Sequence, residues 1–132
     1  MDIRVFLVDD SNKTRRLLAD VLVGQGFVFV GEAGTEAEAN FWLDEHVGAW
    51  DLAIIDLLLE QGAGLGVVAR CRRHSSEGKV VVFSAYASPA VRNRCIELGA
   101  DMVFDKTELG PLLEYCRSLA KRPAAGAGRP SS

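Results

Sequence analysis

The chain has 132 residues, the usual size of one domain, and 48% of them are apolar, which is enough for a core without disulfides or a structural metal. Its 15 Lys and Arg residues against 18 Asp and Glu residues give a formal charge of -3, with no run of basic residues dense enough for a nucleic-acid patch. We therefore expect a single domain that does not bind DNA directly.

The first half of the chain alternates strand and helix patterns. A short apolar, β-branched run predicts a strand at Ile3–Val8, and a helical pattern follows from about Lys13 to Gln25 until two glycines break it. Strand character returns at Phe27–Ala33, and a Thr-x-x-Glu capping box at Thr35 then opens a second helix. The first helix is expected to bury Leu17, Leu18, Val21 and Leu22, and the second carries Ala37, Phe41 and Trp42.

The second half repeats this alternation three times. Thr107 is expected to cap the last helix, whose buried face should hold Leu109, Leu112, Leu113, Cys116 and Leu119. The predicted strands are Leu52–Asp56, Lys79–Phe83 and Met102–Asp105, and the predicted helices are Leu65–His74, Pro89–Gly99 and the segment after Thr107.

The C-terminal segment differs in composition from the rest. Residues 122–132 read "RPAAGAGRPSS", which lacks the large apolar side chains that packing requires. We expect a disordered tail at 122–132 and a folded domain at 1–121.

Strands that alternate with helices, and that are apolar throughout, indicate a parallel sheet covered by helices on both faces. Right-handed crossovers favour a doubly wound α/β fold, in which ligands bind beyond the carboxyl ends of the strands. Polar residues follow four of the predicted strands and should meet at that edge: Asp9 and Asp10, then Asp56, Ser84 and Lys106.

The chemistry of these five residues is consistent with a phosphoryl site. Three carboxylates in one cleft repel one another, and a hard divalent cation such as Mg²⁺, which prefers oxygen ligands, relieves that repulsion. A lysine and a hydroxyl would neutralise and orient a phosphoryl group, because phosphoryl transfer is catalysed largely by positioning and charge. A carboxylate can also act as the nucleophile and form an aspartyl phosphate.

Four motifs between Asp2 and about Lys121 carry a resemblance to a known family: "FLVDDS", "DLAIIDLLLEQGAGL", "VVVFSAY" and "LGADMVFDKTE". In this order and spacing the sequence resembles the receiver domain of two-component response regulators. The resemblance implies a flavodoxin-like (βα)5 fold with strand order 2-1-3-4-5. It also implies that Asp56 is the phosphoacceptor, that Asp9, Asp10, Asp56 and the backbone carbonyl of Leu58 bind Mg²⁺, and that Ser84 and Lys106 contact the phosphoryl group.

The resemblance also implies partners. A sensor histidine kinase or a phosphotransfer protein, or a small donor such as acetyl phosphate, would phosphorylate the domain, which would then bind a downstream protein. We expect a stand-alone response regulator that is not an enzyme beyond its own phosphorylation and slow autodephosphorylation. The alternatives are a pseudo-receiver, an interaction module that is not phosphorylated, and a receiver fragment of a longer regulator.

The sequence departs from the family pattern at three places. Thr107 stands where a proline often follows the lysine, so no cis peptide bond is expected there, and Glu60 lies in a region that often holds a proline. The aromatic residue usually found three positions before the lysine is Val103, and the adjacent Phe104 should point to the opposite face of the sheet. We therefore expect Tyr86 to couple phosphorylation to the surface of the fourth helix, fifth strand and fifth helix.

Two other phosphate-handling classes fit less well. A haloacid-dehalogenase-like phosphatase needs a second Asp two residues after the first as a general acid, and Leu58 occupies that position. A flavodoxin-like FMN carrier would offer hydroxyls and amides to the phosphate, whereas Asp9 and Asp10 would repel it.

The remaining sequence signals are of a general kind. The chain shows neither a signal-peptide pattern nor an apolar segment of membrane-spanning length, and we expect a cytoplasmic protein. Its three cysteines, Cys71, Cys95 and Cys116, lie far apart in helical patterns without a histidine at ligand spacing, so we expect buried, reduced thiols.

Overall fold

The computed structural model describes residues 2–85 and 87–121, which form a five-stranded parallel sheet in the order β2-β1-β3-β4-β5. The predicted fold class and strand order are therefore confirmed. The strands are β1 Ile3–Val8, β2 Phe27–Ala33, β3 Leu52–Ile55, β4 Lys79–Ser84 and β5 Met102–Asp105; the helices are α1 Asn12–Leu22, α2 Glu36–Glu45, α3 Gly64–His74, α4 Pro89–Leu98 and α5 Leu109–Lys121.

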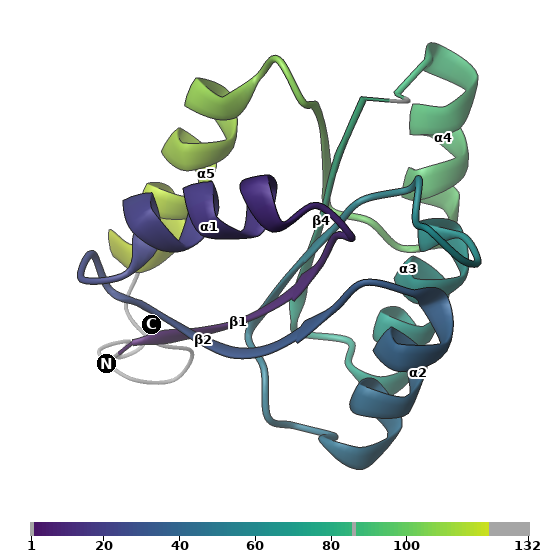
Figure 1. The fold of residues 1–132 in the computed structure, drawn as a ribbon, viewed down its shortest axis with the longest axis horizontal. Helices are drawn as coiled ribbons and strands as arrows, with labels where there is room; N and C mark the ends of the chain where they lie inside the picture. The colour runs from purple at the N-terminus through teal and green to yellow at the C-terminus, as the bar shows by residue number, and fades with distance from the viewer. Residues whose placement is uncertain (1, 86, 122–132) are drawn as a thin grey trace, which may run out of the picture.

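Helices cover both faces of the sheet, with α1 and α5 on one face and α2, α3 and α4 on the other (Figure 1). The alternation of side chains along β1 shows why: Val5 and Leu7 pack into the cluster beneath α1 and α5, whereas Phe6 and Val8 pack into the cluster beneath α2, α3 and α4. Because both faces are buried, each central strand must be apolar throughout, as the sequence pattern indicates.

Two details of the predicted helices are wrong. Helix α1 ends at Leu22, because Val23 adopts an extended conformation and forms a bridge with Phe27 ahead of the expected helix end. Leu17 is 42% exposed, so the buried face of α1 is formed by the other three predicted residues, Leu18, Val21 and Leu22.

Of the two aromatic residues named for the second predicted helix, only Trp42 packs against the core. Phe41 is 69% exposed, whereas the indole of Trp42 stacks on the ring of Phe6 with the centroids 4.2 Å apart. A Cβ atom at Gly31 of β2 would overlap that indole, so the glycine makes room for Trp42. Helix α2 is therefore rotated to place Trp42, Ala39 and Leu43 against the sheet.

Thr107 does not cap α5, contrary to the prediction. Its hydroxyl donates to Oδ1 of Asp105 at 2.9 Å, as does its backbone N–H, so the threonine oxygen closes a turn after β5 instead. The carboxylate of Glu108 accepts in turn from the backbone N–H of Asp105 at 2.8 Å.

The three cysteines are buried and free of disulfides, as predicted. Burial raises the pKa of Cys71 to about 12 and that of Cys116 to about 11, so both thiols are protonated at neutral pH. Within residues 2–85 and 87–121 no peptide bond is cis, in agreement with the expectation for Thr107, and no helix is long and apolar enough to cross a membrane. The predicted tail at 122–132 lies outside the described residues.

Candidate functional site

Three carboxylates meet at the carboxyl edge of the sheet. Asp9 and Asp10 follow β1, Asp56 follows β3, and an oxygen of each lies within 4.8 Å of the others. Asp9 and Asp56 are only 2% and 8% exposed, whereas Asp10 is exposed to solvent. We call this cluster, in which Asp10 is the member exposed to solvent, the acidic pocket.

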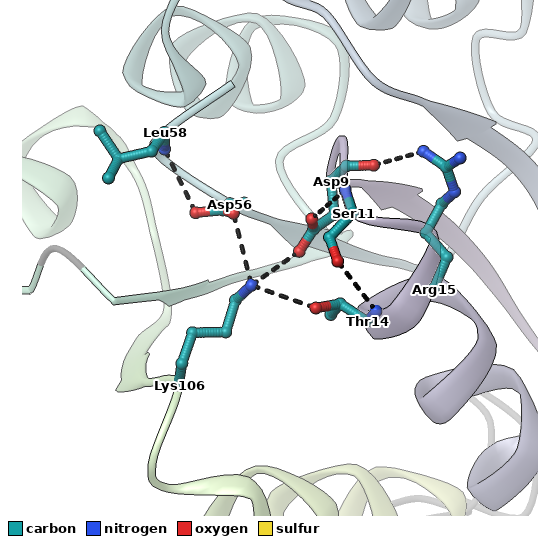
Figure 2. A network of polar contacts seen from close by, with 7 residues as sticks. All are labelled: Asp9, Ser11, Thr14, Arg15, Asp56, Leu58 and Lys106. Carbon is teal, nitrogen blue, oxygen red and sulfur yellow. Dashed lines mark hydrogen bonds and ion pairs between the residues drawn. The ribbon is translucent and has the colours of Figure 1, made fainter. Parts of the chain in front are cut away.

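Lys106, which follows β5, supplies the opposite charge. Its Nζ donates to Oδ2 of Asp9 at 3.0 Å and to Oδ2 of Asp56 at 3.4 Å (Figure 2). Burial lowers the pKa of Lys106, but the hydrogen bond that it donates to Asp9 and the attraction of both carboxylates outweigh this effect, so the pKa lies above its ordinary value. The lysine is therefore a fixed positive charge between two of the three carboxylates.

The ionised form of Asp9 is less well stabilised by its surroundings than the charged form of Lys106. Burial raises the pKa of Asp9 above its ordinary value, and this effect exceeds the opposing effects of the Ser11 backbone N–H and of Lys106. One lysine thus does not fully compensate the buried negative charge. A second positive charge in the pocket would stabilise the ionised carboxylates.

The first turn of α1 fixes the loop that carries Asp9. Ser11 caps the helix by accepting from the N–H of Thr14 at 3.2 Å, and its own N–H donates to Oδ1 of Asp9 at 2.8 Å. The guanidinium of Arg15 donates to the backbone carbonyl of Asp9, and the hydroxyl of Thr14 lies 3.4 Å from Nζ of Lys106 (Figure 2).

Thr14 and Arg15 were not predicted from the sequence as residues of the site. A usable signal exists, because side chains in the first turn of a helix lean back toward the loop before it. A polar residue at position 14 or 15, directly after the aspartate pair, is therefore placed to contact that loop.

Leu58 and Ser84 complete the predicted set. The backbone N–H of Leu58 donates to Oδ1 of Asp56 at 3.2 Å, while its side chain is 54% exposed and points away from that carboxylate (Figure 2). Ser84 is fully buried at the end of β4, and its backbone carbonyl accepts from the N–H of Lys106 at 3.2 Å. Asp9, Asp10, Asp56 and Lys106 therefore share one pocket, with the Leu58 backbone and the end of β4 beside it.

The donor set fits a hard cation. The three side chains that could hold an ion are all carboxylates, which are the ligands that Mg²⁺ prefers, and the solvent-exposed Asp10 leaves a route for exchange. Nitrogen and sulfur ligands, which a zinc site would use, are absent from this cluster.

Val103 and Phe104, the two residues of β5 considered for the switch, lie on opposite faces of the sheet. Val103 packs beneath α4 with the cluster of Val82 and Cys95, whereas Phe104 faces α5, with its ring centroid 6.2 Å from that of Tyr115. Adjacent residues of β5 thus point to opposite faces, as predicted. Tyr86 lies outside the described residues, and its coupling role stays a prediction.

Arg92 of α4 links three segments on this side of the molecule. Its guanidinium donates to the carbonyl of Ala87 at 3.1 Å, to that of Val103 at 2.9 Å and to Oε1 of Glu108 at 3.2 Å. It therefore joins the loop after β4 to β5 and to the residue before α5. No sequence signal distinguishes this arginine from its neighbour Arg94.

Comparison with known proteins gives one consistent result. The sequence model of the family described as "Response regulator receiver domain" matches residues 5–115. The chain is 27% identical to the chemotaxis protein CheY of Bacillus subtilis over 97 residues, which cover 74% of this chain and 79% of CheY. It is 31% identical to a putative transcriptional regulator of Pseudomonas aeruginosa over 105 residues, covering 80% of this chain and 50% of that protein.

Solved structures of response regulator proteins are also similar to this chain. The signal receiver domain of the putative response regulator NarL from Mycobacterium tuberculosis aligns with a TM-score of 0.73 and 25% identity over 89% of this chain and 97% of that one. A chain of the CheX-CheY-BeF3-Mg complex from Borrelia burgdorferi aligns with a TM-score of 0.80 and 20% identity, over 91% of this chain and 90% of that one.

The comparisons differ in how much of each relative they cover. The chain spans about half of the length of several curated relatives and a quarter of a cyclic di-GMP phosphodiesterase from Thermotoga maritima. The match of the family model over residues 5–115 includes the three aspartates of the acidic pocket, β2 to β5 and most of β1. The chain belongs to the response regulator receiver domain family.

Proposed function

We propose that this receiver domain accepts a phosphoryl group on Asp56 in the presence of Mg²⁺ and signals by phosphorylation-dependent binding to another protein. One observation carries the proposal: the buried Asp56 lies within 4.8 Å of two further aspartates and forms an ion pair with Lys106 at 3.4 Å. Its carboxylate thus has a positive charge beside it, and the neighbouring Asp10 is exposed to solvent.

The proposed transfer is a displacement at phosphorus. An oxygen of Asp56 forms the new bond to the phosphoryl group, and the bond to the leaving group breaks with its electron pair staying on the donor, either a phosphohistidine or acetyl phosphate. Lys106 would move from the carboxylates to a phosphoryl oxygen, and the Ser84 hydroxyl would donate to another.

The metal would be held by Asp9, Asp10, Asp56 and the backbone carbonyl of Leu58. When bound, Mg²⁺ supplies neutralisation of the charge shared by the carboxylates and the phosphoryl group. The CheX-CheY complex with BeF3 and magnesium is one structural relative that contains this ion. In the present chain the buried charge of Asp9 provides the reason to bind it, because burial disfavours that charge without a second cation.

The proposed partners follow from the same chemistry. A sensor histidine kinase or a phosphotransfer protein would donate the phosphoryl group, and a downstream protein would bind the phosphorylated domain. We further propose that the domain catalyses nothing beyond its own phosphorylation and slow dephosphorylation.

The test is the intact mass of the protein after incubation with acetyl phosphate. Wild type should gain one phosphoryl group with Mg²⁺ and none with EDTA, and Asp56→Asn should gain none under either condition. Asp20→Asn, which removes an exposed carboxylate from α1, is the matched control and should behave as wild type. A wild type that never gains the mass would favour the pseudo-receiver, and a gain that persists in Asp56→Asn would refute the acceptor.

A further inference from the structure

Helix α3 begins without a capping side chain of its own. Its N-cap residue is Ala63, whose backbone is extended as a cap requires but whose methyl group cannot accept a hydrogen bond. A side chain from another helix binds the cap residue itself: Oε1 of Glu36, the first residue of α2, accepts from the backbone N–H of Ala63 at 2.8 Å. In addition, the backbone N–H of Glu36 donates to the carbonyl of Gln61 at 3.1 Å.

The Glu36 side chain fits closely against two glycines of this region. A Cβ atom at Gly62 would overlap Cβ of Glu36, and a Cβ atom at Gly66 would overlap Oε2. Gly62 also has a φ of +84°, which favours glycine. A carboxylate at this point also interacts favourably with the positive end of the α3 dipole. Glu36 thus holds the loop between β3 and α3 at two points, in a space that side chains at positions 62 and 66 would fill.

This loop starts at the acidic pocket. Ala63 forms an antiparallel bridge with Leu58, and the N–H of Gly64 donates to the carbonyl of Leu57 at 3.0 Å. Leu58 in turn donates its N–H to Oδ1 of Asp56 at 3.2 Å. A continuous set of backbone contacts therefore runs from the Glu36 carboxylate to the phosphoacceptor and to the residue whose carbonyl is the proposed fourth metal ligand.

We propose that Glu36 is a positioning residue of the metal site: by holding residues 61–63 it fixes the backbone of Leu58 and the carboxylate of Asp56 for Mg²⁺. The inference rests on the proposed function, because it takes this pocket to be the one that binds Mg²⁺. Residues that orient metal ligands without touching the metal typically change metal affinity 10–100-fold when they are lost. In this proposal the length of the Glu36 side chain, which lets it contact Ala63, matters more for Mg²⁺ affinity than its negative charge.

Two substitutions separate the effect of side-chain length from the effect of charge. Glu36→Gln keeps the length and the acceptor oxygen but loses the charge, whereas Glu36→Asp keeps the charge but shortens the side chain so that it no longer reaches Ala63. Mg²⁺ is titrated into each protein while backbone amide NMR shifts are followed. We expect Glu36→Asp to bind Mg²⁺ about 10-fold more weakly than wild type and Glu36→Gln to stay within about 3-fold. The opposite ranking would show a long-range effect of charge and would overturn the inference.

A double substitution separates positioning from simple helix capping. Glu36→Ala removes the acceptor, and adding Ala63→Asn gives α3 a capping side chain of its own. We expect the double variant to regain thermal stability but not Mg²⁺ affinity. Recovery of both would mean that Glu36 only caps the helix, which would also overturn the inference.

The same titration distinguishes failure of the inference from failure of the proposed function. A wild type whose spectrum does not respond to Mg²⁺ would contradict the proposed function, and the inference with it. If wild type binds Mg²⁺ and both Glu36→Asp and Glu36→Ala bind it with the same affinity, the inference alone is contradicted.

Discussion

Asp9 shows how a single residue of the pocket sets a balance between function and stability. It is almost fully buried and pairs with Lys106 at 3.0 Å, yet burial still raises its pKa. A raised pKa means that the folded chain holds the Asp9 proton more tightly than the unfolded chain does. The ionised carboxylate therefore costs stability, and this cost is absent below the pKa of the unfolded state and complete once the pH has risen through the pKa of the folded state.

Asp9→Asn should accordingly stabilise the metal-free protein at neutral pH. The amide oxygen can still accept from the N–H of Ser11, while the buried charge is removed, so we expect the free energy of unfolding to rise by about 1 kcal/mol. The gain should disappear at pH values below about 4, where Asp9 is protonated in both the folded and the unfolded state. Thermal unfolding in EDTA across this pH range measures it, and a less stable variant at pH 7 would show that pairing with Lys106 outweighs burial.

Leu58 bears on how long the phosphorylated state would last. Its side chain stands exposed beside the pocket, and unlike an amide it offers no hydrogen bond to a hydrolytic water. We expect Leu58→Asn to shorten the lifetime of the phosphoprotein several-fold, because an amide can orient that water. Leu58→Ala, which removes the isobutyl group without adding an amide, separates shielding from orientation. The decay of the phosphoprotein mass is the readout, and unchanged or slower decay in Leu58→Asn would exclude this role.

Several individual residues of the pocket could be predicted because their placement depends only on where strands end. Asp9, Asp56 and Lys106 each follow a strand directly, and parallel strands bring their carboxyl ends together. Glu36 and Arg92 could not be found in this way. Their contacts depend on how far each helix is rotated about its axis and on loop conformation, which the apolar pattern leaves open.

At the scale of elements, the strands were the most predictable part and the helix ends the least. For β5 the observed bounds, Met102–Asp105, are the predicted ones, because the apolar run of a buried strand marks where it lies. Helix ends depend on competition between neighbouring polar groups. Thr107 is a suitable N-cap residue, yet its hydroxyl bonds to Asp105 instead, and Glu108 occupies the position before α5.

Arg92 joins the elements that would report phosphorylation. It holds the loop after β4, the β5 backbone and Glu108 together, and these segments flank Ser84 and Lys106. Val103, where the family usually has an aromatic residue, is short and stiff about its first torsion. Through Arg92, a shift of either loop would reach α4 and the start of α5.

We therefore expect Arg92→Met to weaken the response of α4 and α5 without abolishing phosphorylation. The response is measured as the change in backbone amide NMR shifts on adding beryllofluoride with Mg²⁺, and it should fall by about half or more. Arg94→Met removes an arginine of the same helix whose contact is an exposed ion pair with Glu97, and this control should respond as wild type does. Equal responses in the two variants would assign the coupling to another residue.

At the scale of the whole molecule, strand order places the site. With β1 and β3 adjacent, the acidic residues after each strand become neighbours, and β4 and β5 bring Ser84 and Lys106 to the same edge. Continuous apolar strands, alternating helices and the four motifs are all visible in the sequence, which is why the fold class and family could be predicted from it. Contacts between α2 and α3 and between α4 and β5 required the structure.

The most direct test of the account is to locate the phosphoryl group itself. Borohydride reduces an aspartyl phosphate to homoserine, which marks the modified residue permanently and can be found by mass spectrometry of peptides. After treatment with acetyl phosphate and Mg²⁺, we expect homoserine at position 56 and unmodified aspartate at positions 9 and 10. Homoserine at another position, or none at 56 in a protein that has gained the phosphoryl mass, would contradict it.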